Sequence, residues 1–329
     1  MQEISPDQPV ASVESAGELL RQVRAETGKV IFGQETVIDL TMTTLLCGGH
    51  ALLIGVPGLA KTSLVETLGS VLGLTNKRIQ FTPDLLPSDI LGSEVLEEGE
   101  DGRRHFRFVP GPIFTQLLMA DEINRASPRT QSALLQAMQE NHVSIGGVRH
   151  DVPQPFHVLA TQNPIEQEGT YPLPEAQLDR FMLQVDVDYP DADAERRIMA
   201  ATTGVEQPTL ETVLTGEQLQ AMQRLVRLMP VGEDVVEAIL KVVRSARPGT
   251  DADSMTEEQL DWGPGPRASQ TLMLAVRARA MMDGRFAPSL DDVVALAGPA
   301  LKHRMALSPA ARNDEVTVTD VIDRLVARI

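Results

Sequence analysis

The residues best able to do chemistry in this sequence form a glycine-bearing loop after a short apolar run. Residues 52–54 are Leu-Leu-Ile, and the next loop ends in Lys61 and Thr62, where a helix is expected to begin. In such loops backbone N–H groups point at phosphate, the lysine reaches the β- and γ-phosphate oxygens, and the hydroxyl holds Mg²⁺. The pattern predicts a phosphate cradle, with a chance glycine-rich turn as the alternative; its residues are Gly55, Val56, Pro57, Gly58, Leu59, Ala60, Lys61, Thr62 and Ser63.

One position of this loop departs from the general P-loop pattern. A glycine usually precedes the lysine, and this chain has Ala60. If Ala60 has helical φ and ψ angles, a methyl group is sterically allowed there.

A second apolar run ends in two carboxylates. Residues 114–120 are mostly apolar and precede Asp121 and Glu122, as expected for a buried parallel strand whose end lies beside the loop. Asp121 would then bind Mg²⁺ together with Thr62, directly or through water, and Glu122 would polarise the attacking water. Alone, such a pair is more often a strand end entering solvent. Its pairing with the loop favours the catalytic interpretation.

Two further polar positions extend this pattern. Asn163 follows the apolar residues 156–160 and could bind the attacking water or the γ-phosphate, with an Asn-Pro turn as the alternative. Arg180 ends a short helical segment, where its guanidinium could stabilise charge on a transferring phosphoryl group. For Arg180 the alternative is a surface salt bridge.

Five segments, in this order, resemble a known family over nearly the whole chain: residues 55–62, 121–126, 161–164, 171–181 and 265–269. The sequence resembles a MoxR-type AAA+ ATPase, and the segments are similar to Walker A, Walker B, sensor 1, the arginine-finger region and sensor 2. The family's own P-loop variant has the alanine found here at position 60. The resemblance implies that Lys61 and Thr62 bind phosphate and Mg²⁺, that Asp121 and Glu122 serve metal and water, and that Asn163 senses the γ-phosphate.

The resemblance also implies roles for residues outside the two apolar runs. Arg267 would contact the nucleotide from a lid, and a structural arginine is the alternative. Arg180 would act in trans on the nucleotide of the neighbouring subunit, with Arg125 and Arg129 as weaker candidates for an intersubunit role. Gly33 and Gln34 lie in a segment that resembles the one packing against adenine, although a plain helix N-terminus would have the same pattern.

The rhythm of elements indicates an α/β fold followed by helices. Strands ending at Ile54, near Phe81, at Met119 and at Ala160 alternate with helices at 62–72 and 128–140, which predicts a parallel sheet with helices on both faces. Beyond residue 190 only helices are expected, at 193–202, 217–227, 233–247, 268–282, 290–305 and 319–329. We therefore expect an N-terminal helix plus AAA+ core over residues 1–205 and an all-α lid over 206–329.

Two insertions interrupt the α/β rhythm. Residues 83–90 form an expected short helix before strand-like runs at 93–97 and 105–109, and this segment resembles the helix-2 insert of the MoxR branch. Residues 142–152 alternate around Gly146-Gly147, a hairpin signal whose family counterpart precedes sensor 1. We hypothesise that both inserts carry mechanical output, so that deleting residues 97–104 uncouples hydrolysis from remodelling. Surface decoration is the alternative.

Composition narrows the function classes. The chain has 329 residues with 42% hydrophobic and 23% charged residues, which is ordinary for a soluble globular protein. A net charge of −17 disfavours direct nucleic-acid binding. The single Cys47 forms no intrachain disulfide, and no Cys/His cluster has metal-ligand spacing. No apolar run reaches the ~18 residues of a membrane span. The first residues are unlike a signal peptide, so a cytoplasmic location and no membrane insertion are expected.

The sequence thus predicts Mg²⁺-dependent ATP hydrolysis in a homo-oligomeric ring, with a hexamer expected from the resemblance. Hydrolysis would drive chaperone-like remodelling or maturation of a client protein, and the family's usual partners suggest one with a von Willebrand A domain. Alternatives are a nucleic-acid-linked motor or transcription activator, which would need a basic pore loop or DNA-binding domain, and a slow nucleotide-gated scaffold. Glu122 and Arg180 argue against the scaffold.

Overall fold

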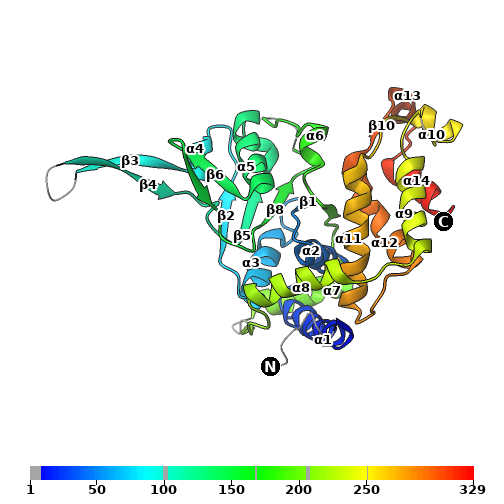
Figure 1. Cartoon of the computed structure of the whole chain (residues 1–329), viewed down its shortest axis with the longest axis horizontal. Helices are drawn as coiled ribbons and strands as arrows, with labels where there is room; N and C mark the ends of the chain where they lie inside the picture. Colours follow the sequence, from blue (N-terminus) through cyan, green and yellow to red (C-terminus); the bar gives the residue numbers. More distant parts are fainter. Residues whose placement is uncertain (1–8, 99–102, 167–168, 205–207, 250) are drawn as a thin grey trace.

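The computed structural model describes residues 9–98, 103–166, 169–204, 208–249 and 251–329, and places an α/β part beside a helical part (Figure 1). Among the described residues the central sheet has five strands in the order β2-β5-β8-β1-β9, and all neighbours pair in parallel. The strands are β1 (Ala51–Ile54), β2 (Asn76–Gln80), β5 (Leu117–Asp121), β8 (His157–Gln162) and β9 (Leu183–Asp186). The predicted parallel sheet is confirmed.

Helices cover both faces of this sheet. Alternate residues of a strand point to opposite faces, so Leu53 and Met119 join one buried cluster while Leu52 and Leu118 join another. The first cluster includes side chains of α1 (Pro9–Thr27), α2 (Glu35–Leu46) and α3 (Lys61–Val71), and the second those of α4 (Pro87–Leu91) and α5 (Pro128–Glu140). The strands therefore read as continuous apolar runs because both faces are buried.

The strand ends agree with the sequence within about two residues. β5 continues through Asp121 and β8 through Gln162, so the polar residues there are hydrogen-bonded into the sheet instead of following it. The short helix α6 (Glu175–Leu178) lies where a short helical segment was expected before Arg180. β9 was not anticipated, because a four-residue strand is too short for periodicity to identify.

Both predicted inserts form antiparallel hairpins. One is β3 (Gly92–Glu98) with β4 (Arg104–Pro110), and the other is β6 (His142–Ile145) with β7 (Val148–Asp151). The rings of Phe108 and His150 stack with centroids 3.9 Å apart, which joins the two hairpins. Leu96 and Phe106 are exposed on the longer hairpin, which projects from the α/β part in Figure 1. Residues 99–102 of the segment proposed for deletion lie outside the described residues.

The second part of the chain is helical with one short antiparallel strand pair. Its helices are α7 (Ala192–Thr203), α8 (Gly216–Leu228), α9 (Glu233–Ser245), α10 (Ser254–Gln259), α11 (Pro266–Met282), α12 (Leu290–Leu301), α13 (Pro309–Asn313) and α14 (Val318–Val326). The pair is β10 (Leu260–Trp262) with β11 (Ala306–Leu307), and the expected helix at 290–305 instead ends at Leu301, before a 3₁₀ turn, η2 (Lys302–Arg304). In the described part of the chain no helix is both long and apolar enough for a bilayer.

The lid packs against the core. The Gln223 amide of α8 donates to the Leu45 carbonyl of α2 at 2.8 Å, so α8 packs on the α/β part. The expected boundary at 205/206 falls outside the described residues, and it stays a prediction.

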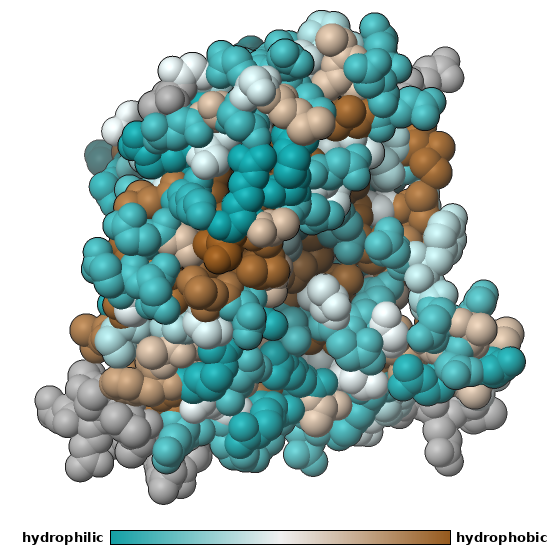
Figure 2. All heavy atoms as spheres, turned by 90° about the vertical axis from the view of Figure 1, so that its right-hand side faces the viewer, coloured by the Kyte–Doolittle hydropathy of each residue, from teal (hydrophilic) through white to brown (hydrophobic). Residues whose placement is uncertain are grey.

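Figure 2 shows the outer face of the lid, where apolar side chains gather between bands of polar residues. A hollow of about 610 Å³ on the lid is lined by Leu240, Leu290 and Ile329 among charged residues.

Candidate nucleotide-binding and hydrolysis site

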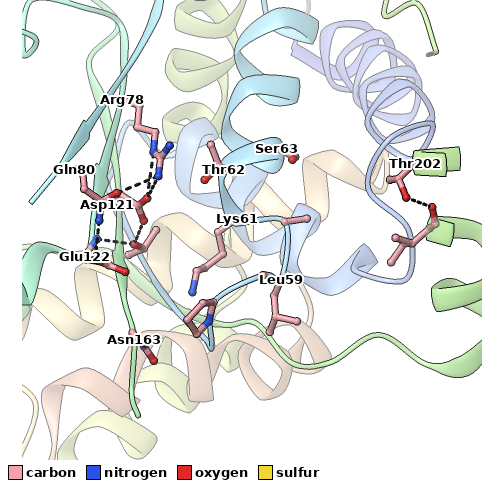
Figure 3. Close-up of a pocket in the computed structure, with 15 residues that line it drawn as sticks. Leu59, Lys61, Thr62, Ser63, Arg78, Gln80, Asp121, Glu122, Asn163 and Thr202 are labelled. Carbon is pink, nitrogen blue, oxygen red and sulfur yellow. Dashed lines mark hydrogen bonds and ion pairs between the residues drawn. The ribbon is translucent and has the colours of Figure 1, made fainter. Parts of the chain in front are cut away.

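A cavity of about 520 Å³ opens at the carboxyl ends of the central strands (Figure 3). Ligands bind parallel α/β sheets at this edge because loops there lead into helix N-termini. The cavity brings together residues from the loop after β1, the ends of β2, β5 and β8, and one face of α7. Its lining residues are Pro57, Gly58, Leu59, Ala60, Lys61, Thr62, Ser63, Arg78, Gln80, Asp121, Glu122, Thr161, Asn163, Ile198 and Thr202.

Ala60 does not have right-handed helical φ and ψ angles. Ala60 has φ 55° and ψ 20°, in the left-handed region, and it is the N-cap of α3, whose carbonyl accepts from the Leu64 amide at 2.9 Å. A Cβ in this region costs roughly 1–2 kcal/mol. The loop must reverse direction between β1 and α3, and that turn, not the local sequence, sets the angle. Gly58 also has positive φ, and a Cβ there would meet no atom within 4 Å, which leaves the loop open toward the cavity.

Lys61 lies at the floor of the cavity. Its ammonium donates to the carbonyl oxygens of Gly55 and, at 3.1 Å, of Val56. Burial lowers the pKa of Lys61, and the nearby carboxylates of Asp121 and Glu122 oppose that shift. Gly55 and Val56 thus contact Lys61 but are not among the lining residues, although the sequence placed them in the phosphate cradle. In Figure 3 the ammonium points toward the side of the cavity that holds Glu122 and Asn163.

Both predicted residues share one partner, Thr161. The Thr161 hydroxyl donates to Asp121 Oδ1 at 2.6 Å and accepts from the backbone amide of Glu122 at 2.9 Å. Glu122 itself has φ 54° and ψ 50°, so the chain turns sharply after β5. The structure therefore fixes the Asp121 carboxylate and the Glu122 backbone relative to β8. Only the resemblance had placed position 161 in the sensor 1 segment, and no role had been predicted for it.

Two residues of β2 also hold these carboxylates. Arg78 donates to Asp121 Oδ2 through Nη2 at 2.6 Å and Nε at 3.1 Å, and Gln80 donates to Glu122 Oε2 at 2.7 Å. Their roles were missed, yet a signal exists, because residues i and i+2 of a strand share a face. Arg78 and Gln80 are polar and flank the buried Ile79, so they lie on one face of β2. Asp121 of the neighbouring β5 lies on the same face, because it pairs with Gln80.

A smaller cavity of about 160 Å³ continues from the first one. Both are lined by Ile198 and Thr202 of α7, and the smaller one also by Phe32 and Gln34. The Gln34 amide nitrogen donates to the Leu59 carbonyl at 3.2 Å, whereas Gln34 Oε1 is buried and has no partner in the described part of the chain. Gly33 has φ +67°, and a Cβ there would lie 2.3 Å from the Ala194 Cβ, so only glycine fits against α7.

Comparison with known proteins identifies the family. The model of the ATPase family associated with various cellular activities (AAA) matches residues 50–183, and an AAA lid domain model matches residues 252–325. Chaperone MoxR1 of Mycobacterium tuberculosis is 41% identical over 92% of this chain and 80% of its own length. Protein MoxR of Paracoccus denitrificans is 32% identical over 94% of this chain and 95% of its own length. This chain belongs to the MoxR family of AAA+ ATPases.

A solved structure supports the same assignment at the level of fold. A crystal structure from Cytophaga hutchinsonii superposes with a TM-score of 0.88 at 33% identity and covers 96% of each chain. The expected MoxR-type architecture, an AAA+ α/β core followed by a helical lid, is confirmed.

None of the four arginines that the MoxR resemblance singled out lines the cavity. One of them, Arg125, contacts a residue that does. Arg180 donates to the Leu135 carbonyl of α5 at 2.6 Å, and Arg267 donates to the backbone and carboxylate oxygens of Asp179 at 3.3 and 3.5 Å. Arg125 binds Glu122 at 3.0 Å and lies 3.6 Å from Glu166, while Arg129 is exposed on α5. The structure does not bring Arg180 or Arg267 to the nucleotide cavity of the same chain.

Proposed function

We propose that this MoxR-family protein hydrolyses ATP with Mg²⁺ in a homo-oligomeric ring, and that hydrolysis drives remodelling of a client protein. The observation that carries the proposal is the convergence of Lys61, Thr62, Asp121, Glu122 and Asn163 on one cavity at the end of a parallel sheet. These side chains lie on three different segments of the chain. Their assembly matches what phosphoryl transfer to water requires.

The residues present fit a Mg–nucleotide complex. The open side of Gly58 and the helix start at Lys61 suit the phosphates, and the buried, unpartnered Gln34 Oε1 can accept from an exocyclic amine of a base in the smaller cavity. Thr62 and Asp121 would hold Mg²⁺, a hard cation that takes oxygen ligands and would neutralise phosphate charge. Arg267 would reach the nucleotide only with the lid in another position.

The protein groups have separate tasks in this reaction. Lys61 would bind the β- and γ-phosphate oxygens, and Glu122 would accept a proton from the attacking water, which Asn163 would orient. Thr161 holds the backbone of Glu122 and one oxygen of Asp121. Arg180 would approach the nucleotide of the neighbouring subunit, because in its own chain it points at α5 and not at the cavity.

Several observations support the ring and the remodelling of a client. Leu240 and Leu290 are exposed and line a hollow on the lid, and apolar side chains gather on the lid face in Figure 2. Apolar surfaces of this kind mark contacts with other chains. The exposed Leu96 and Phe106 of the longer hairpin suit contact with a client. A relative is named a chaperone, which favours a protein client. A von Willebrand A domain partner, a hexamer and a cytoplasmic location complete the proposal.

Substituting the glutamate tests the proposed chemistry. Glu122→Gln keeps the size of the side chain but removes its basicity, so ATP should bind with wild-type affinity while turnover falls by about 100-fold or more. Nucleotide binding is followed with a fluorescent ATP analogue and turnover by phosphate release. Glu66→Gln, on the exposed face of α3, is the matched control and should hydrolyse ATP normally. Normal turnover by Glu122→Gln would remove Glu122 from the mechanism.

A further inference from the structure

One fully buried arginine of the lid is hydrogen-bonded to the core. Arg304, at the end of η2, has no exposed side-chain surface, and the described residues offer an acceptor to each of its five N–H groups. Nε donates to Asp179 Oδ1 at 2.6 Å, Nη1 donates to Met182 O at 3.1 Å and to Ala300 O, and Nη2 donates to Phe181 O at 2.8 Å. The Asp179 carbonyl and the Thr271 hydroxyl lie at 3.3 and 3.4 Å from Nη2.

The preceding lid residue, His303, binds the same core segment. His303 is buried, and burial together with the Arg304 charge lowers its pKa to about 3, so the ring is neutral. Its Nε2 lies 3.0 Å from the Phe181 carbonyl and donates to it. Two consecutive lid residues therefore bind the backbone of residues 179–182, which we call the finger segment because Arg180 lies within it.

Arg180 is held from both sides. Its backbone belongs to the finger segment, which η2 binds, while its guanidinium makes a hydrogen bond of 2.6 Å to Leu135 of α5 in the core. Breaking a buried ion pair costs several kcal/mol because it leaves a charge without a partner, whereas one hydrogen bond to a carbonyl contributes much less. The finger segment is also tied to the core, because Phe181 is buried among core side chains and the Met182 amide donates to the His50 carbonyl at 2.7 Å. The Arg304–Asp179 ion pair connects this core-anchored backbone to the lid.

We propose that Arg304 and Asp179 are positioning residues for Arg180, and that through them the lid adjusts the conformation of the finger segment. The lid of one subunit would then determine how Arg180 is presented to the nucleotide of the next subunit. The coupling deepens the proposed function and rests on it, since it requires Arg180 to act in trans. Arg267 contacts the same Asp179 carboxylate, so a second lid residue is attached to the segment.

A complementation assay separates the effect of Arg180 placement from ATP hydrolysis by the chain that carries Arg180. The acceptor is Arg180→Ala, which keeps an intact nucleotide site but supplies no finger. The donor is Lys61→Ala, which supplies Arg180 but has no working site. In mixtures of the two, all activity above that of the separate proteins comes from acceptor sites completed by donor fingers. Three donors are compared: Lys61→Ala alone, Lys61→Ala with Arg304→Lys, and Lys61→Ala with Lys302→Ala.

The lysine at 304 keeps the charge but lacks the planar fork, so it loses most of the carbonyl contacts. We expect this donor to restore about tenfold less activity than Lys61→Ala alone, because small misplacements at a reacting centre have effects of this size or larger. The loss should appear in kcat, with the KM of the acceptor sites for ATP unchanged. Lys302→Ala breaks a lid–core ion pair in the same turn, to Asp186 at 2.7 Å, without touching the finger segment, and it should restore activity fully.

Three results would overturn the coupling. The first is full complementation by the Arg304→Lys donor, with melting temperature and assembly as in the wild type. The second is equal loss with the Lys302→Ala donor. The third is no complementation by Lys61→Ala itself, which shows that the shared site, and with it the proposed function, is wrong. If Arg304→Lys does not fold, the Asp179→Asn donor replaces it. If that also fails, hydrogen exchange on the wild type decides: residues 180–182 and 302–304 must change protection together between ADP and an ATP analogue, and independent changes refute the coupling.

Discussion

Ala60 shows how a single residue in the phosphate loop carries conformational strain. It has φ 55° and stands where the turn from β1 into α3 requires a left-handed residue. Lys61 and Thr62 follow it directly, so the angle at Ala60 sets the direction of both side chains. The family's preference for alanine could be seen in the sequence, but the sign of φ could not, because tertiary packing of the loop determines it.

Replacing this alanine with glycine should stabilise the protein. Ala60→Gly removes the Cβ that opposes the left-handed conformation, and we expect the free energy of unfolding to rise by about 1 kcal/mol. Urea unfolding of both proteins measures the difference. Ala133→Gly, in the middle of α5, is the control and should lower the free energy of unfolding by about 1 kcal/mol. Equal or lower stability of Ala60→Gly would contradict the conformation described for the loop.

In the proposed mechanism Arg78 would compete with Mg²⁺ for Asp121. Its guanidinium donates twice to Asp121 Oδ2, the oxygen that Thr161 leaves free, so Mg²⁺ would have to displace this pair to gain that oxygen. The Arg78 side chain is about half exposed, at 49%, and such pairs contribute up to about 1 kcal/mol. Sequence analysis offered Asp121 as a ligand but missed that Arg78 would bind it, although the polar residues at 78 and 80 carried a signal.

Arg78→Gln should therefore lower the Mg²⁺ concentration needed for tight nucleotide binding. We expect a shift of up to about fivefold, the factor that corresponds to about 1 kcal/mol. Titrating Mg²⁺ against a fluorescent ADP analogue measures the midpoint. Lys77→Gln removes a positive charge from the neighbouring residue of β2 and should leave the midpoint unchanged. A midpoint that stays the same or rises in Arg78→Gln would show that Arg78 does not compete with the metal.

At the scale of elements, three buried histidines join segments that are distant in sequence. His50 accepts from the Val158 amide and donates to the Met138 carbonyl, and His157 donates to the Gly49 carbonyl while the Gln223 amide of α8 donates to it. Burial lowers the pKa of His50 to about 3 and that of His157 to about 4, and His303 has a similar value of about 3. All three are neutral in the folded chain.

These histidines should make stability depend on pH. In the unfolded chain they titrate near 6.5, so between about pH 6.5 and 4 the unfolded state binds more protons than the folded state. The stability they contribute is complete above pH 6.5 and is lost as the pH falls toward 3–4. We expect the free energy of unfolding to fall by about 1.4 kcal/mol per pH unit for each histidine, as measured by urea unfolding from pH 7 to 5. His157→Gln should show a smaller slope; a slope equal to wild type would contradict the assignment.

The elements that position the site were largely predictable from sequence. Long apolar runs before Asp121 and Asn163 identified β5 and β8, and the loop into Lys61 identified β1 and α3. Three features escaped prediction. β9 and the β10–β11 pair are too short for periodicity, α7 gave no signal that it would line the nucleotide cavity, and η2 replaced the end of a predicted helix. Each depends on tertiary contacts, such as the pairing of β9 with β1 and of β10 with β11, which local sequence does not encode.

At the scale of the whole molecule, the site of one chain is incomplete in the proposed mechanism. Lys61, Asp121, Glu122 and Asn163 meet in the cavity, whereas the Arg180 guanidinium binds α5 and the lid binds the backbone of the neighbouring Phe181. A ring would place the finger segment of one subunit at the cavity of the next. The net charge of −17 is compatible with this only if the contacting surfaces bury apolar side chains, such as those on the lid face in Figure 2.

The most direct test of this account is the specific ATPase activity as a function of protein concentration, for the wild type and for Arg180→Ala mixed with Lys61→Ala. If active sites are shared, specific activity rises with concentration as subunits assemble, and the mixture of two inactive proteins regains activity. If specific activity is constant over the concentration range and Arg180→Ala alone turns over ATP normally, each chain is a self-sufficient nucleotide switch and the ring mechanism is wrong.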